Sequence, residues 1–194
     1  MKKTILLVAA VGVMHLLHAQ RNNVEFGIKA GINAANFKID PSFNSDARIG
    51  LHVGGLAHIH VSEHFAVQPE LVISGQGAKY GDDNEDKFTY LNLPILAQVM
   101  FGDGFRVQTG PQPGLLMNAK SENGNQESDI DDNFKRGDFS WTFGGGYLSH
   151  SGLGVDIRYN LGISNISERN PDVKNRVWQF GLFYQFRDRP YASK

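Results

Sequence analysis

The sequence predicts an all-β protein, an eight-stranded antiparallel up-and-down barrel that crosses a membrane with its strands. Three observations predict this fold. Apolar and polar residues alternate with a period of two through eight segments, which places them on opposite faces of each strand. Short turns and long polar loops alternate between the segments. An export signal precedes them, and no window has a comparable apolar stripe with a 3.6-residue period.

Composition sets the outer limits. The 194 residues suit a single domain, and the absence of Cys excludes disulfide frameworks, thiolate metal sites and a Cys nucleophile. Beyond residue 20, no apolar run approaches the ~20 residues that a spanning helix needs. The formal net charge of -1 argues against a nucleic-acid partner, because nucleic-acid binders are normally basic.

The first twenty residues resemble an export signal. Lys2 and Lys3 precede an apolar stretch from Ile5 to Leu17, and the small residue Ala19 follows. This pattern is typical of a cleaved secretory signal peptide, and the apolar stretch is short for a membrane anchor. We therefore expect a signal peptide over residues 1–20, a barrel domain over 21–187 and a short tail over 188–194.

The alternation is clearest near the C-terminus. There, Val155, Ile157 and Tyr159 share one face, while Asp156 and Arg158 share the other. The eight alternating segments cover residues 24–34, 48–60, 65–76, 90–101, 105–118, 138–147, 153–164 and 178–186. At ~3.3 Å per residue and a tilt near ~40°, segments of about 11 to 14 residues span the ~25 Å apolar band of an outer membrane.

Connection lengths agree with a membrane barrel. Short turns are expected at 61–64, 102–104 and 149–152, and longer polar loops at 38–47, 81–87, 120–135 and 167–174. Short periplasmic turns, longer extracellular loops and an even strand number are typical of outer-membrane barrels.

The two faces decide which side meets lipid. One face is almost free of charge, whereas the other collects charged residues and many of the glycines. A soluble barrel would instead place bulky apolar residues inside. We therefore expect a polar lumen, filled by a network of ion pairs. Its predicted members are Lys29, Arg48, Glu70, Arg106, Asp156 and Arg158.

Aromatic residues gather toward both ends of the apolar face. This placement predicts two interfacial girdles, with core aromatics of a β-sandwich as the alternative. The girdle residues are Phe26, Phe101, Phe105, Trp141, Tyr147, Trp178, Tyr184 and Phe186.

Several short motifs resemble an outer-membrane β-barrel family known as PorT-like or porin-family proteins. They are the stretches 68–71 (QPEL), 90–94 (YLNLP), 110–114 (GPQPG) and 156–162 (DIRYNLG). The resemblance covers residues ~24 to 187 and implies an eight-stranded barrel in a Gram-negative outer membrane. The motifs place Pro69, Pro94, Pro111 and Pro113 within strands, where we expect bulges to accommodate them.

The last segment resembles the signal that the barrel-assembly machinery recognises, polar-x-Gly-x-x-aromatic-x-aromatic. The matching residues are Gln179, Gly181, Tyr184 and Phe186. The match departs from the usual pattern because eight residues follow Phe186. The machinery is the partner that this resemblance implies during biogenesis.

Other candidate sites are weaker. His52, His58 and His60 share the polar face and could bind Zn or Cu, but hydrogen-bonded lumen histidines are commoner. The acidic stretches 82–86 and 129–133 could attract Ca²⁺, although the second lacks the glycine and glutamate of an EF-hand. We expect no metal site, no cofactor and no enzymatic activity, since no acid is placed to orient the histidine of 149–151 (SHS) as a triad requires.

The sequence thus predicts a monomeric barrel in the outer membrane, surrounded by lipid. The expected role is structural or interactive, with a filled or narrow polar lumen and polar extracellular loops. Two alternatives remain open: an accessory to protein secretion, which the PorT-like resemblance implies, and a soluble periplasmic carrier barrel. Any secretion or surface partner is left unidentified.

Overall fold

The computed structural model describes residues 24–39, 43–80, 84–123, 126–168 and 171–186. The expected signal peptide (1–20) and the expected tail (188–194) lie outside these ranges. The strands are β1 (Val24–Ile39), β2 (Phe43–Asn44), β3 (Asp46–His60), β4 (Phe65–Lys79), β5 (Asn84–Asn92), β6 (Ile95–Phe101), β7 (Phe105–Asn123), β8 (Gln126–Asp129), β9 (Gly137–Leu148), β10 (Leu153–Gly162) and β11 (Val173–Phe186). One 3-10 turn, η1, covers Asp131–Asn133.

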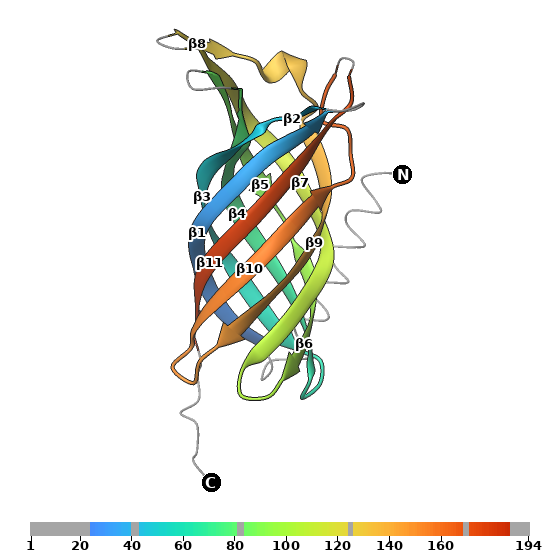
Figure 1. Cartoon of the computed structure of the whole chain (residues 1–194). Helices are drawn as coiled ribbons and strands as arrows, with labels where there is room; N and C mark the ends of the chain where they lie inside the picture. Colours follow the sequence, from blue (N-terminus) through green and yellow to red (C-terminus); the bar gives the residue numbers. More distant parts are fainter. Residues whose placement is uncertain (1–23, 40–42, 81–83, 124–125, 169–170, 187–194) are drawn as a thin grey trace.

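The strands form a closed antiparallel ring (Figure 1). Around the ring the order is β1, β3, β4, the pair β5 and β6 (which share one place in the wall), β7, β9, β10 and β11. The ring closes because β11 pairs with β1 from Phe26↔Phe186 to Ile39↔Val173. Strands β2 and β8 are short additions, and β5 and β6 are two halves of one wall position. The predicted eight-stranded up-and-down barrel is therefore confirmed.

The two ends of the barrel differ. The first residues of β1, the last residues of β11 and the turns 61–64, 102–104 and 149–152 lie at one end, called here the turn end. The long connections lie at the other, the loop end, where β7 and β8 form a hairpin beyond the wall (Figure 1). Long connections are typical of the extracellular end of outer-membrane barrels.

Strands reach further into the loop end than the alternation predicts. Strand β7 runs to Asn123, inside the expected loop 120–135, and β11 begins at Val173, inside 167–174. The hydrogen-bonded ladder continues there because the inward side chains still pack against other apolar side chains. Phe37, Phe88 and Val173 belong to one buried apolar cluster at this end.

The prolines are accommodated differently from the expectation. The register shifts lie between Ala47 and His52 and between Thr89 and Tyr90, not at a proline. Instead, the wall strand breaks between β5 and β6, where Pro94 cannot donate to a ladder. Neighbouring backbone bonds bridge the break, since Glu70 N donates to Pro94 O at 2.9 Å. The other three prolines remain inside paired strands.

The outer face of the wall is apolar. On β10, Val155, Ile157 and Leu161 are exposed, whereas Asp156 and Arg158 between them are buried. The same alternation holds on β1, where Ile28 is 57% exposed and Lys29 is 3% exposed. This arrangement requires an apolar surrounding, because so many outward aliphatic side chains would otherwise face water. No helix within the described ranges is long and apolar enough to cross a membrane.

Candidate functional site

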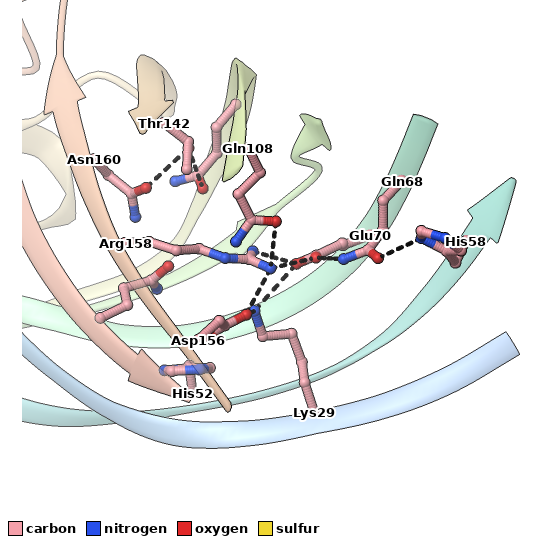
Figure 2. A network of polar contacts seen from close by, with 12 residues as sticks. Lys29, His52, His58, Gln68, Glu70, Gln108, Thr142, Asp156, Arg158 and Asn160 are labelled. Atoms are coloured by element: carbon pink, nitrogen blue, oxygen red, sulfur yellow. Dashed lines mark hydrogen bonds and ion pairs between the residues drawn. The ribbon is translucent and has the colours of Figure 1, made fainter. Parts of the chain in front are cut away.

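Four charged side chains meet in the middle of the lumen (Figure 2). Arg158 Nη1 and Nη2 donate to Glu70 Oε2 and Oε1 at 2.7 and 2.8 Å, a bidentate pair between β10 and β4. Arg158 also pairs with Asp156 at 2.7 Å. Lys29 Nζ lies 3.1 Å from Asp156 Oδ2 and 3.4 Å from Glu70 Oε2. We call Lys29, Glu70, Asp156 and Arg158 the central network.

The central network is electrically balanced and dry. Its two cations and two carboxylates come from three strands, and each side chain is at most 2% exposed. Burying one of these charges alone would carry a desolvation penalty of several kcal/mol, on the order of what its partners recover. The four groups therefore stabilise the barrel only as a set.

Neutral polar side chains extend the network toward the turn end. Gln68 Nε2 donates to Glu70 Oε1 at 2.6 Å, and Gln68 Oε1 lies 3.2 Å from His58 Nδ1 (Figure 2). On the neighbouring strands β6 and β7, Gln98 Nε2 donates to Gln108 Oε1 at 2.8 Å. Amide side chains thus take up part of the hydrogen-bonding capacity that the ion pairs leave over, on Glu70 and Arg158.

A second hydrogen-bonded group lies toward the loop end. Asn33 Nδ2 donates to Ser74 Oγ at 2.9 Å, and Asn33 Oδ1 lies 2.8 Å from His52 Nδ1. Gln179 Nε2 donates to the same Asn33 oxygen at 3.2 Å. Thr142 on β9 donates to Asn160 on β10 at 2.8 Å. Side chains from β11, β1, β3 and β4, and separately from β9 and β10, are therefore hydrogen-bonded toward the loop end of the lumen.

The structure separates the other two predicted lumen charges from the central network. Arg48 lies near the loop end, where its Nη1 donates to Gln76 O at 3.2 Å and its Nε is 3.5 Å from Glu85. Arg106 lies near the turn end, with its guanidinium carbon 5.4 Å from the centroid of the Phe183 ring. The six predicted charges thus lie at three levels along the barrel axis.

Apolar clusters lie at both ends of the lumen, a feature that the polar-face analysis missed. The turn-end cluster is Leu56, Leu148 and Phe183. The loop-end cluster is larger and is built from Phe37, Ala78, Phe88, Tyr90, Leu116, Ala119, Ile166 and Val173. From end to end, the lumen is apolar, polar and apolar again.

A folded loop helps to close the loop end. Phe134, just after η1, packs edge-on against Phe88 with ring centroids 4.6 Å apart. The Asp131 carboxylate accepts a hydrogen bond from Ala119 N, and Asp131 N donates to Asp129 Oδ1 at 3.1 Å. Two carboxylates of this acidic stretch thus accept hydrogen bonds from backbone amides, one on β7 and one within the stretch. The other stretch, 82–86, lies partly outside the described residues.

The three histidines are placed as parts of the lumen. His52 and His58 each hydrogen-bond a neutral amide, and the rings of His58 and His60 meet edge-to-face at 4.5 Å. The SHS turn lies at the turn end, where the hydroxyls of Ser149 and Ser151 are 2.7 Å apart.

The close packing around Gly154 predicts that a larger residue there destabilises the barrel. A Cβ there would overlap the ring of Phe183, which Leu56 and Leu148 hold from the other sides. We expect Gly154→Ala to lower the free energy of unfolding by about 1–3 kcal/mol, measured by urea titration in phospholipid vesicles. The control is Gly55→Ala, whose Cβ would meet nothing closer than Gly27 O at 3.8 Å. Equal losses in both variants would contradict a tightly packed turn-end cluster.

The aromatic residues lie at two levels of the outer wall. At the turn end, strand pairing brings Phe26 opposite Phe186 and Phe105 opposite both Phe101 and Tyr147. The Tyr184 and Phe186 rings are in contact there, at 5.5 Å. Toward the loop end, Trp178 packs against Tyr159 at 4.8 Å, and Trp141 Nε1 donates to Thr109 Oγ1 at 2.8 Å.

The residues that resemble an assembly signal lie on β11, the strand that closes the ring against β1. Gln179 and Gly181 face the lumen, whereas Tyr184 and Phe186 face outward. A Cβ on Gly181 would crowd the Asp156 carboxylate, so this glycine also makes room for the central network.

Charged residues continue the outer face of β4, β5 and β7 beyond the apolar wall. Lys87 pairs with Glu122 and, at 3.0 Å, with Glu85, which also lies 4.0 Å from Lys79. The hydrogen bonds to Glu122 and Glu85 raise the pKa of Lys87 above its ordinary value. We call Lys79, Glu85, Lys87 and Glu122 the charge ladder.

Comparisons with known proteins agree with this geometry. The similar solved structures include Ail, the attachment invasion locus protein of Yersinia pestis, at 16% identity and a TM-score of 0.56 over 84% of this chain and 99% of that chain. Ail in complex with the heparin analogue sucrose octasulfate has a TM-score of 0.54 at the same identity and coverage. Neisserial surface protein A (NspA) has 11% identity and a TM-score of 0.62 over 83% and 97% of the two chains.

These likenesses concern the fold. A search of curated proteins finds no match to this chain. The sequence profile described as "Outer membrane protein beta-barrel domain" matches residues 18–168, most of the chain. Together with the apolar outer wall, this match locates the protein in the cell outer membrane. The chain belongs to the outer membrane protein beta-barrel domain family.

Proposed function

We propose that this barrel is a non-enzymatic structural and interaction protein of the outer membrane, with a closed lumen. The observation that carries the proposal is the layering of the lumen, in which apolar clusters lie on both sides of the central network. An eight-stranded barrel has an interior just wide enough for side chains to fill. The protein accordingly acts through its outer wall and its loop end rather than through a pore.

A closed lumen predicts an electrical result. Purified protein in planar lipid bilayers should give no stable conductance step, because ions would have to pass the loop-end cluster, the buried ion pairs and the turn-end cluster in turn. Phe183→Ala removes apolar volume from the turn-end cluster only, so this variant should also give no stable conductance step. A large, stable conductance from the wild-type protein would contradict the closed lumen while leaving the fold untouched.

The loop end is the proposed interaction surface. The β7–β8 hairpin extends beyond the wall (Figure 1) and β8 pairs only with β7 among the described strands. Such an edge offers unpaired backbone groups to a partner strand. The name of the structurally similar Ail describes attachment and invasion, and we extend to this chain only the idea of surface contact.

A second candidate is an accessory role in protein secretion, supported by the PorT-like motifs. A deletion strain separates the two roles when secretion, permeability and surface adhesion are measured together. Loss of secretion with normal adhesion would favour the accessory role, and the reverse would favour surface interaction. Complementation with a chain lacking the β7–β8 hairpin would then locate the function.

Two further parts of the proposal concern assembly. The protein is proposed to be a monomer that the barrel-assembly machinery inserts by way of β11. The soluble periplasmic carrier is set aside, because a carrier would place its apolar side chains inside and this barrel places them outside.

A further inference from the structure

A basic cluster lies on the outer wall at the loop end, on β1 and β11. Strand pairing sets Lys38 directly opposite Lys174, and Asn36 opposite Arg176. The alternating neighbours Val173, Asn175 and Val177 are buried, so Lys174 and Arg176 point away from the lumen. We call Lys38, Lys174 and Arg176 the basic cluster.

The height of the basic cluster matches lipid headgroups. On β11 the outward residues are apolar or aromatic from Phe186 to Trp178, and the next two are Arg176 and Lys174. At ~3.3 Å per residue and a tilt near ~40°, these two lie about 5 and 10 Å beyond Trp178. The polar headgroup layer is about 5–8 Å thick on each side of a bilayer. Arg176 therefore lies within that layer, and Lys174 at its outer edge.

The opposite wall provides a contrast. The basic residues of the charge ladder, Lys79 and Lys87, pair with Glu85 and Glu122. Within the described residues, the side chains of Lys174 and Arg176 have no carboxylate within ion-pair distance. The Lys174 and Arg176 side chains therefore favour an external anion more than the paired lysines of the charge ladder do.

We propose that the basic cluster binds the phosphate groups of a phosphorylated glycolipid in the outer leaflet, such as lipopolysaccharide. Arg176 and Lys174 reach the phosphates from beside the wall, while Trp178 and Tyr159 pack against the upper part of the acyl layer. Guanidinium and ammonium groups are both suited to phosphate oxygens. The inference rests on the outward orientation of the loop end in the proposed function, and not on whether the lumen conducts.

The test is a titration of the folded protein in detergent micelles with diphosphoryl lipid A, followed by native mass spectrometry. We expect Lys174→Gln/Arg176→Gln to raise the Kd about 30-fold, equivalent to about 1 kcal/mol for each basic residue. The matched control, Lys79→Gln/Lys87→Gln, removes the same charge from the opposite wall and should change the Kd less than about 3-fold. Lipid A without its phosphates should bind all three proteins equally weakly.

Several results would overturn the proposal. One is an equal loss of affinity in the control variant, and another is tight binding of dephosphorylated lipid A by the wild type. Competition by sucrose octasulfate at the potency of lipid A would assign the surface to soluble polyanions instead. Should the double variant fail to fold on a heat-modifiability gel, each single variant should raise the Kd about 5-fold. Orientation is checked separately by external cleavage at a protease site inserted in the β7–β8 hairpin.

Discussion

Replacing Glu70 with Gln should lower the free energy of unfolding by about 3–5 kcal/mol, the cost of breaking a buried charge pair by removing one partner. Glu70 accepts both hydrogen bonds of the bidentate Arg158 contact and one from Gln68, and it pairs with Lys29. The variant leaves two cations facing the single carboxylate of Asp156. Urea titration in phospholipid vesicles, followed by tryptophan fluorescence, measures the loss.

Two controls make this prediction specific to the central network. Glu122→Gln removes a carboxylate from the half-exposed charge ladder and should cost at most about 1 kcal/mol. Lys29→Met added to Glu70→Gln restores the charge balance, so the double variant should be more stable than the sum of the single losses by about 0.5–3 kcal/mol. A Glu70→Gln variant as stable as the wild type would mean that water reaches these charges.

The sequence predicts the outer wall well because its signal is repetitive. Each outward residue, such as Ile157, has apolar neighbours two positions away in both directions, and the pattern is renewed on every strand. The inward partners Asp156 and Arg158 follow from the same parity. Parity also indicates that Lys29 and Glu70 face inward, since each alternates with exposed neighbours.

The odd–even alternation along a strand (its parity) does not tell how high a residue lies along the barrel axis. For this reason the predicted lumen charges lie at different heights in the structure. Arg48 lies near the loop end, at the register shift between Ala47 and His52, where its guanidinium pairs with Glu85 of the charge ladder. Arg106 begins β7 and therefore lies near the turn end. Only strand register places such residues relative to one another, and register depends on pairing partners far away in the sequence.

The apolar clusters were missed because they break the alternation only locally. Phe183 has the parity of Gln179, Gly181 and Gln185, so it lies inside, but the run Leu182–Tyr184 conceals this in a simple apolar count. Phe37 lies where the expected polar loop 38–47 begins, and Phe88 where the expected polar loop 81–87 ends. Their burial depends on partners from distant strands, such as the 5.2 Å contact between their own rings.

Ile157→Arg should lower the free energy of unfolding by about 2–4 kcal/mol, because it places a cation on the lipid face at mid-depth. Ile157 is the middle outward residue of β10 and is 44% exposed on the wall. Urea titration in phospholipid vesicles gives the loss, and the fraction of heat-modifiable protein in cells gives its effect on assembly.

Depth, rather than charge itself, determines this effect, and the same strand provides the control. Leu153 is also outward, but it pairs with Tyr184 of the turn-end aromatic level, where an arginine side chain can reach the headgroups. Leu153→Arg should therefore cost only about 0–1 kcal/mol. Equal losses at Leu153 and Ile157 would place both residues at one depth, and two small losses would place the outer wall of β10 against something other than lipid. A large loss at Ile157 with a small one at Leu153 is the result expected of a membrane that spans the wall between the two aromatic levels.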